Sequence, residues 1–388
     1  MTKDKKKFKV IDVLSITLSH HIHDLFTAFP AALNTVILES FSISNRLFGL
    51  LFVVQRIPTL FNPFIGILAD KVRIRYVMIF APTVTSVAMS IMGNMNSYIS
   101  LVVLVFISGI GSTLFHVPTP VMMKHVSGSK PGLGMGLYMF GGELARTIGP
   151  VVALGAVDIW GFDGMFRLIP AGLLSSLILF LRFRDVDLRK EFNKSTQEEG
   201  TYFLVLKKFA PLFIIIASVT FVRGGMKSIF SYYLVSYLEY ELGWMKFKAG
   251  LALSVVYMAG TVGSLLAGLV SDIIGKRTTL LIISLITPAL YWVFILNNQA
   301  TLPMLGVIGF FLLSPTPVFL SIVNSLKSKH ATFLNGIYMT SIFVMSALAT
   351  MLTGMALDFL DTGVTLRITA IVAFFAVPLV LLLPTKNQ

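Results

Sequence analysis

The sequence contains no cysteine, and only 13% of its residues are charged. A soluble domain carries about 25% charged residues, so this composition disfavours a water-soluble fold. The absence of cysteine excludes disulfides and thiolate metal sites. The chain does have 55% apolar residues and a formal net charge of +13 over 388 residues. This balance predicts an all-α membrane protein whose basic residues lie outside the bilayer core.

Twelve apolar stretches are each long enough to cross a bilayer, which takes about 20 helical residues. We expect membrane-spanning helices at residues 13–38, 45–69, 76–94, 98–123, 133–158, 165–183, 209–237, 246–271, 278–297, 301–326, 332–358 and 365–384. The first stretch follows a basic start but has no cleavage site, which indicates a retained helix. The predicted organisation is an N-terminal six-helix bundle at 1–183, a charged cytoplasmic linker at 184–208 and a C-terminal six-helix bundle at 209–388.

The basic residues gather on one side of these predicted spans. With a cytoplasmic N-terminus, the inner segments hold 22 of the 31 lysines and arginines and nine of the 18 acidic residues. The balance is +13 inside, −2 outside and +2 within the spans. This asymmetry predicts a multi-pass protein of the inner membrane with both termini cytoplasmic. The positive charge is therefore a topology signal and does not indicate nucleic-acid binding.

Three segments recur, in the same order, about 200 residues further along the chain. The pairs are Gly66–Arg75 with Gly268–Arg277, Pro118–Val121 with Pro315–Val318, and Gly136–Met139 with Gly336–Met339. Repeats in one order and at similar offsets indicate that each half is one six-helix unit.

Two six-helix repeats around a charged linker resemble the major facilitator superfamily, whose loop motif reads G-x-L-x-D-R-x-G-R-[RK]. The first copy departs from the motif by placing Arg73 at a glycine position. The resemblance implies a cytoplasmic gate formed by helix ends, in which an aspartate and basic residues act as a latch. The implied gating residues are Gly66, Asp70, Lys71, Arg75, Gly268, Asp272, Lys276 and Arg277. The alternative is that the basic members serve topology alone.

Three further segments resemble the fosmidomycin-resistance-type exporters of that superfamily. These are Ser19–Asp24, Gly109–His116, and the glycines and proline of the stretch Gly141–Pro150. His23 replaces an asparagine of the pattern, and Val117-Pro118 replaces a Pro-Glu. The resemblance implies alternating access around a central cavity and export driven by protons.

Ionisable residues inside the spans are costly, at about 2.5–3.5 kcal/mol each even on lenient scales, so they are candidates for function. They are His20, His21, His23, Asp24, Arg56, His116, Glu143, Arg146, Arg223 and Lys227. None has a like-charged counterpart in the other half near the repeat offset, which favours substrate-specific work over scaffolding.

His20 and Asp24 are four residues apart, so they share one face of a helix. Histidine changes its charge near neutral pH, and the pair therefore predicts a proton-coupling site at Asp24 and His20, to which we add Glu143. The alternative is that Asp24 only neutralises an arginine. His21 and His23 are expected to pack or to form hydrogen bonds.

A divalent metal is a further alternative at these residues. His20, His21 or His23, Asp24 and His116 have suitable ligand types. However, adjacent helical histidines diverge by about 100°, and the spans also hold four lysines and arginines. We therefore predict no metal site.

The surplus of cations within the spans favours an anionic substrate, since arginine binds oxyanions in a bidentate fashion. Predicted substrate-binding residues are Arg56, His116, Arg146, Arg223, Lys227 and Tyr233. Glu143 and Arg146 are three residues apart and can instead pair with each other.

These observations predict a monomeric, proton-coupled transporter that exports a small anionic compound or drug and needs no cofactor. Its partners would be the substrate, protons and the lipid bilayer. The alternatives are an uptake symporter or facilitator for an anionic metabolite, and a divalent-metal transporter. An enzyme is disfavoured, because the sequence has no nucleophile–base pattern and no phosphate-binding loop.

Overall fold

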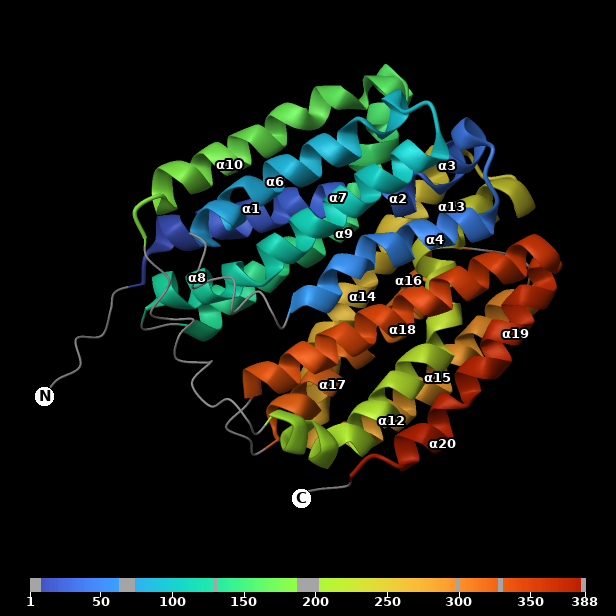
Figure 1. Cartoon of the computed structure of the whole chain (residues 1–388). Coiled ribbons are helices and arrows are strands. Elements are labelled where there is room, and N and C mark those ends of the chain that lie inside the picture. Colours follow the sequence, from blue (N-terminus) through green and yellow to red (C-terminus); the bar gives the residue numbers. More distant parts are fainter. Residues whose placement is uncertain are drawn as a thin grey trace, which may run out of the picture. The chain divides into compact units, whose positions relative to one another are not determined.

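The computed structural model describes residues 8–62, 74–128, 131–186, 202–297, 301–326 and 331–384, and these ranges contain helices and no strand. The helices up to residue 186 are α1 (Val10–Thr27), α2 (Phe29–Ala32), α3 (Asn34–Phe41), α4 (Asn45–Arg56), η1 (Ile57–Phe61), α6 (Ile74–Ser90), η2 (Met92–Asn94), α7 (Tyr98–His116), α8 (Pro118–Ser127), α9 (Pro131–Trp160), η3 (Asp163–Leu168) and α10 (Ile169–Phe183). The later helices are α12 (Tyr202–Ser228), η5 (Ile229–Tyr233), α13 (Leu234–Ser236), η6 (Tyr237–Glu241), α14 (Lys246–Ile274), α15 (Lys276–Asn297), α16 (Leu302–Leu313), α17 (Pro315–Asn324), α18 (Ala331–Phe359), α19 (Thr362–Phe374) and α20 (Ala376–Leu381) (Figure 1).

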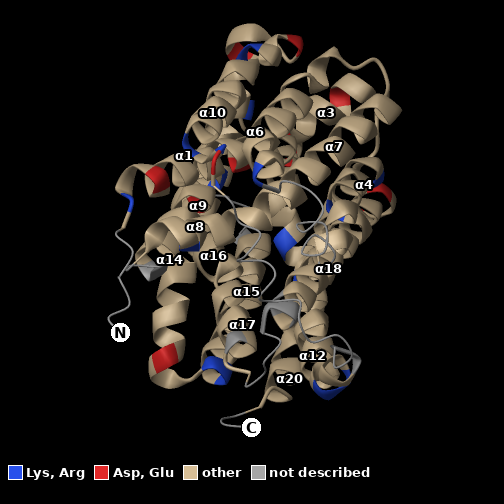
Figure 2. Cartoon of the chain, turned by 60° about the vertical axis from the view of Figure 1, so that its left-hand side comes forward, with Lys and Arg blue, Asp and Glu red and all other residues tan. Residues whose placement is uncertain are grey.

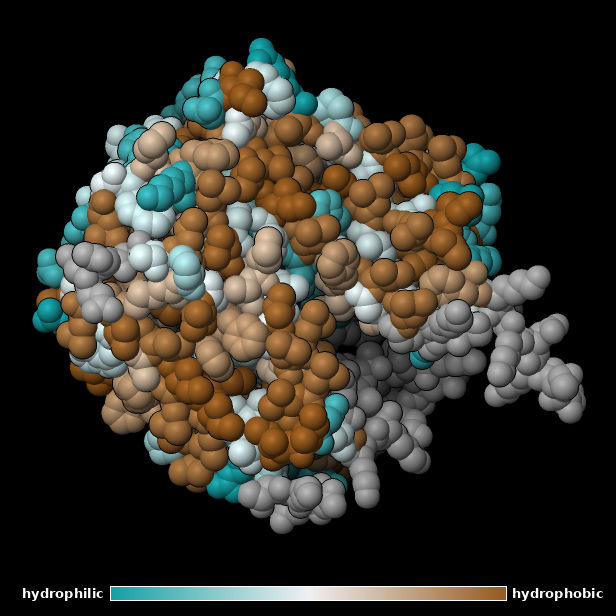
Figure 3. All heavy atoms as spheres, turned by 180° about the vertical axis from the view of Figure 1, so that it is seen from behind, coloured by the Kyte–Doolittle hydropathy of each residue, from teal (hydrophilic) through white to brown (hydrophobic). Residues whose placement is uncertain are grey.

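Much of this helical surface is apolar enough to face lipid. Eight described helical segments could span a membrane by length and composition, or nine if the bent pair Asn34–Phe41 and Asn45–Phe61 forms one span. Apolar residues cover most of the face in Figure 3, and long stretches of the helices in Figure 2 carry no charge. The all-helical membrane fold is thus confirmed, whereas the count of twelve spans in two repeats stays a prediction. Helix α1 contains three histidines and two aspartates, which lower its hydropathy.

The contacts divide the chain into two compact units. Unit 1 comprises residues 1–30 and 57–197, and unit 2 comprises residues 31–56 and 198–388. The hairpin formed by residues 31–56 therefore groups with the C-terminal half of the chain, although it comes early in the sequence. The domain boundaries predicted from the repeat rest on sequence similarity, a different criterion, and stay a prediction.

Each unit has its own apolar core. In unit 1, Phe115, Met122, Tyr138 and Phe183 join α7, α8, α9 and α10 to α1 and α6. In unit 2, side chains of α12, α15, α17, α18 and α20 form the corresponding core. The core of unit 1 fixes α1 against α6, α9 and α10, and this packing positions the charged face of α1.

Prolines of the repeated Pro-Thr-Pro-Val segment divide a predicted span in both halves. Helix α7 ends at His116 and α8 begins at Pro118, whereas α16 ends at Leu313 and α17 begins at Pro315. Proline has no N–H group and its ring clashes with the preceding turn, so a new helix starts there. The predicted spans 98–123 and 301–326 are therefore two helices each, and His116 lies at the end of the first.

In unit 2, the start of α4 is held by α18. The two carboxylate oxygens of Asp358 accept hydrogen bonds from the backbone N–H groups of Asn45 and Arg46, each at 2.8 Å. These N–H groups have no partner inside α4, and an acidic group is stabilising at a helix N-terminus. The hydroxyl of Tyr233 lies 3.2 Å from the Asn45 carbonyl and 3.2 Å from that of Thr350. Residues 31–56 are thus fastened to the C-terminal half by specific polar contacts.

Candidate functional site

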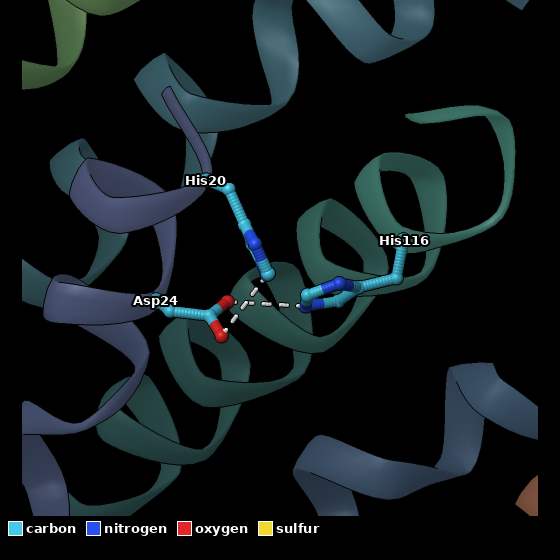
Figure 4. A group of neighbouring side chains, drawn as sticks. All are labelled: His20, Asp24 and His116. Atoms are coloured by element: carbon cyan, nitrogen blue, oxygen red, sulfur yellow. Dashed lines mark ion pairs between the residues drawn. The ribbon is translucent and has the colours of Figure 1, made fainter. Parts of the chain in front are cut away.

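A cluster of three ionisable side chains, of which two are buried and one is partly exposed, lies in unit 1 (Figure 4). Asp24 and His20, one helical turn apart on α1, are each 3% exposed. Asp24 Oδ2 lies 3.3 Å from His20 Nε2, and Asp24 Oδ1 lies 3.1 Å from Nε2 of His116 on α7. The predicted pairing of His20 with Asp24 is confirmed, and each carboxylate oxygen faces one imidazole. We call these three residues the proton cluster.

The protonation of His20 is constrained by its other ring nitrogen. His20 Nδ1 lies 2.6 Å from the backbone carbonyl oxygen of Tyr138 on α9. A carbonyl only accepts hydrogen bonds, so Nδ1 must carry the hydrogen, and Nε2 of a neutral His20 then has a lone pair. That lone pair would face a carboxylate oxygen, and two acceptors cannot bond to each other. One added proton makes this contact an ion pair, and in the described structure neither His20 Nε2 nor Asp24 Oδ1 has a hydrogen-bond partner.

The glycines of α9 make this approach possible. A methyl group on Gly142 would lie 2.6 Å from His20 Cε1 and 3.0 Å from Asp24 Oδ2, and one on Gly141 would lie 2.7 Å from the carbonyl oxygen of Thr17. Any larger residue at either position would separate α9 from α1. The Gly-Gly pair of the exporter-like stretch thus has a local structural reason.

The other two histidines of α1 lie beside the cluster. His21 Nδ1 is 3.2 Å from the carbonyl of Gly141. His23 is fully buried and stacks on Phe115 at a ring distance of 4.6 Å, and neither of its ring nitrogens has a hydrogen-bond partner among the described residues. The predicted packing and hydrogen-bonding roles are confirmed.

Glu143 and Arg146 of α9 form an ion pair of their own. Arg146 Nη1 lies 2.9 Å from Glu143 Oε1, as their spacing in the sequence indicated. The Arg146 side chain is 48% exposed and the Glu143 side chain is 27% exposed, whereas His20 and Asp24 are each 3% exposed. A proton-coupling role for Glu143 and a substrate role for Arg146 stay predictions.

The cluster also has ligand types that suit a divalent cation. One ligand atom from each of His20, Asp24 and His116 lies within 4.8 Å of the others. A divalent ion beside one carboxylate would leave an uncompensated positive charge in a buried place, which is costly. A single proton leaves the His20–Asp24 pair neutral. Charge balance thus favours a proton over a metal ion at this site.

In unit 2, Arg223 of α12 is a buried cation. It is 5% exposed, and its Nη2 donates a hydrogen bond to Thr287 Oγ1 at 3.4 Å. Its Nη1 has no hydrogen-bond partner, and no carboxylate of the described residues lies within 4.0 Å of the guanidinium. A buried charge without a partner is unfavourable. The role of Arg223 in substrate binding stays a prediction.

The other predicted substrate residues of unit 2 have structural contacts. The Arg56 guanidinium lies 4.7 Å from the centre of the Phe343 ring, a cation–π distance. Tyr233 is 1% exposed, and its hydroxyl contacts the backbone carbonyls of α4 and α18 described above. Lys227 is partly buried on α12. Their substrate roles stay predictions.

The basic gating residues bind helix ends within their own units. Arg75 Nη1 donates to the carbonyl of Val186 just after α10 at 2.9 Å, and Arg277 donates to the carbonyl of Leu381 at the end of α20. Lys276 Nζ donates to the carbonyl of Ser321 at 2.8 Å. Carbonyls at helix C-termini have no helical partner, so a cation is stabilising there.

The other five predicted gating residues are Gly66, Asp70, Lys71, Gly268 and Asp272. Gly268 has open space around it, and Asp272 is exposed. Gly275 has φ +93, which explains a glycine at the end of α14. Gly66, Asp70 and Lys71 lie outside the described residues. The gate itself stays a prediction.

The sequence matches the model of the Major Facilitator Superfamily over residues 17–222 and again over 216–388. It is 23% identical over 385 residues to the fosmidomycin resistance protein of Escherichia coli (strain K12), covering 95% of this chain and 91% of that protein. It is 28% identical over 258 residues to the probable sulfoacetate transporter SauU of Cupriavidus necator, covering 63% of this chain and 60% of that protein.

Solved structures of transporters have the same fold. The nucleoside transporter NupG superposes with a TM-score of 0.74 at 14% identity, covering 96% of this chain and 98% of that chain. A bacterial homologue of the human lysosomal transporter Spinster, in an inward-facing and unoccupied conformation, gives a TM-score of 0.73 at 16% identity, covering 98% and 95%. At such identities the likeness concerns the fold alone.

Proposed function

Because the chain belongs to the Major Facilitator Superfamily, and is thus a multi-pass membrane transporter by family, we propose that it exports a small anionic compound in exchange for protons. The observation that carries the proposal is the cluster of His20, Asp24 and His116, in which one added proton turns the His20–Asp24 contact into an ion pair. We propose that the protein works as a monomer with both termini on the cytoplasmic side of the inner membrane.

The proton would enter and leave at the His20–Asp24 pair. Asp24 is the only carboxylate in the cluster, so taking up one proton changes the charge of the buried site from −1 to 0 when the histidines are neutral. A change of one buried charge alters the free energy of each conformation in which the site differs in solvation, and this is what couples proton binding to a conformational change. His116 would support Asp24 and contact substrate through its 38% exposed side chain.

The anionic nature of the substrate is supported by Arg223. Its unpaired Nη1 is a donor that the described residues leave unsatisfied, and a phosphonate, sulfonate or carboxylate would satisfy it. Two relatives are named for fosmidomycin and sulfoacetate, which are both small anions. We propose Arg223 as the principal anion contact, with Arg56, Arg146, Lys227 and Tyr233 as further contacts.

We propose export rather than uptake because the chain is similar to the fosmidomycin resistance protein, and resistance is a typical outcome of efflux. An uptake symporter for an anionic metabolite would use the same charges. The direction of coupled flux therefore has to be measured.

A counterflow screen in proteoliposomes tests the proposal. Liposomes that contain the purified full-length protein are loaded with fosmidomycin, sulfoacetate, other small phosphonates and sulfonates, or a panel of organic cations, and an imposed pH gradient is then added. We expect anions alone to exchange, and an acidic exterior to drive their efflux. Exchange of cations only, or anion efflux that ignores the pH gradient, would refute the proposal.

A further inference from the structure

Tyr138 contacts both histidines of the proton cluster, through three different groups. Its backbone carbonyl binds His20 Nδ1 at 2.6 Å, and its ring stacks on the His20 ring at 3.9 Å with an angle of 11°. Its hydroxyl lies 3.2 Å from Nδ1 of His116. The side chain is 3% exposed, so these contacts are held by the core of unit 1.

The carbonyl of Tyr138 is reachable because of the residue one turn later. In a helix this carbonyl faces the N–H of residue 142, and position 142 is a glycine. The missing side chain of Gly142 leaves the space that the His20 imidazole occupies. The spacing of Tyr138 and Gly142 thus forms a slot on α9 for the ring of His20.

We propose that Tyr138 is a positioning residue that sets which ring nitrogen of each histidine faces Asp24; this inference rests on the proposed role of Asp24 in proton coupling. The carbonyl assigns the hydrogen of neutral His20 to Nδ1 and directs Nε2 to the carboxylate. The hydroxyl donates to Nδ1 of His116, so that a neutral His116 carries its hydrogen on Nε2, which lies 3.1 Å from Asp24 Oδ1.

This assignment gives the two histidines different tasks. His116 stays neutral and turns its Nε2–H toward Asp24 Oδ1, which lies 3.1 Å away. His20 turns its Nε2 lone pair toward Asp24 Oδ2, which lies 3.3 Å away, and this lone pair can accept the exchangeable proton. Tyr138 therefore decides which of the two histidines can take up that proton.

The other titratable and charged groups around the cluster are few. His23 comes from α1, the same helix as His20 and Asp24, and Arg146 comes from α9. His21 also lies on α1 and faces Gly141 of α9. None of these three contacts Nδ1 of either cluster histidine in the described structure, so the positioning effect is specific to Tyr138.

The repeat supplies a matched control for this tyrosine. Tyr338 is the counterpart of Tyr138, is fully buried in unit 2, and donates its hydroxyl hydrogen to the carbonyl of Thr316 at 2.9 Å. The substitution Tyr338→Phe removes one buried hydroxyl with its hydrogen bond, as Tyr138→Phe does, but touches no histidine.

Nitrogen-15 NMR of histidine-labelled full-length protein in lipid bilayers tests the inference during a pH titration. The signals are assigned with the His20→Asn and His116→Asn variants. In the wild type we expect neutral His116 in the Nε2–H form. In Tyr138→Phe we expect a mixture of both forms at His116 and an unchanged Nδ1–H form at His20.

The controls keep the test independent of folding and of transport. Tyr338→Phe should leave both histidines unchanged.

The inference would be overturned by an unchanged His116 form in Tyr138→Phe, or by an equal change of the His116 form in Tyr338→Phe. If the NMR result is as expected but flux ignores the pH gradient, the proposed function fails and the positioning role stands.

Discussion

Asp24 on α1 and Arg223 on α12 are both buried, but only Asp24 has an ion-pair partner among the described residues. Asp24 has an imidazole at each carboxylate oxygen, at 3.3 Å and 3.1 Å. Arg223 has a threonine hydroxyl at 3.4 Å and no carboxylate within ion-pair distance in the part of the chain that the structure describes. The difference favours our proposal that the first charge takes up a proton and that the second binds an anionic substrate.

The largest expected effect comes from breaking the matched site at Gly142. The substitution Gly142→Ala places a methyl group 2.6 Å from the His20 ring and should separate α1 from α9. Overpacking of this kind costs about 1–3 kcal/mol of unfolding free energy, and we expect proton-driven flux to be lost.

Gly155→Ala, on the same helix, is the control for Gly142→Ala. A methyl group at Gly155 meets nothing within 4 Å, so flux should persist and stability should stay the same or rise by up to about 1 kcal/mol. Thermal unfolding and proteoliposome flux, measured on both variants, check this. Wild-type flux in Gly142→Ala would mean that the close approach of α9 is not needed.

Substitution of Arg223, the charge without a partner, should have the opposite effect on stability and stabilise the protein. Because Arg223 is buried and has no counterion among the described residues, Arg223→Leu should raise the melting temperature, by an amount that corresponds to about 1–3 kcal/mol. The same substitution should weaken binding of an anionic substrate by about 10–100-fold, the size of a lost charged hydrogen bond.

Arg146→Leu is the matched comparison, since Arg146 is paired with Glu143 in a more exposed place. It should lower stability slightly or leave it unchanged, within about 1 kcal/mol. A destabilised Arg223→Leu protein would show that Arg223 has a counterion in the folded state, and the contrast between the two buried charges would be lost.

The smallest expected loss of stability should be the same for matching substitutions in the two units. Arg75 and Arg277 are repeat counterparts, and each binds a carbonyl at or just past the end of the last helix of its half. Arg75→Ala and Arg277→Ala should each cost about 1 kcal/mol of unfolding free energy, as for one net hydrogen bond. Calorimetry of both variants checks this. An effect in one variant alone would indicate that the repeat does not extend to these contacts.

Local spacing was enough to predict the contacts within one helix. The His20–Asp24 and Glu143–Arg146 pairs follow from residues that lie three or four apart, and the repeated prolines mark where two helices are divided. The sequence links His116 with Asp24 only because both residues are of types that can bind a metal ion.

Contacts between helices that lie far apart in the sequence could not be predicted from the sequence. The carbonyl of Tyr138 lies 118 residues from His20, and a backbone group leaves no trace in residue type. Gly142 belongs to the stretch that resembles the exporters, but its role in admitting the His20 ring depends on the packing of α1 on α9. The attachment of residues 31–56 to Asp358 joins positions more than 300 residues apart, and nothing local in either segment indicates it.

The central claim is that Asp24, with His20, carries the coupled proton, and flux through Asp24→Asn tests it most directly. Asparagine keeps the size of the side chain but cannot gain or lose a proton. In proteoliposomes that contain this variant, we expect counterflow exchange of the anionic substrate to continue while efflux driven by a pH gradient falls to the level of protein-free liposomes. Gradient-driven efflux at the wild-type rate in Asp24→Asn would contradict the account.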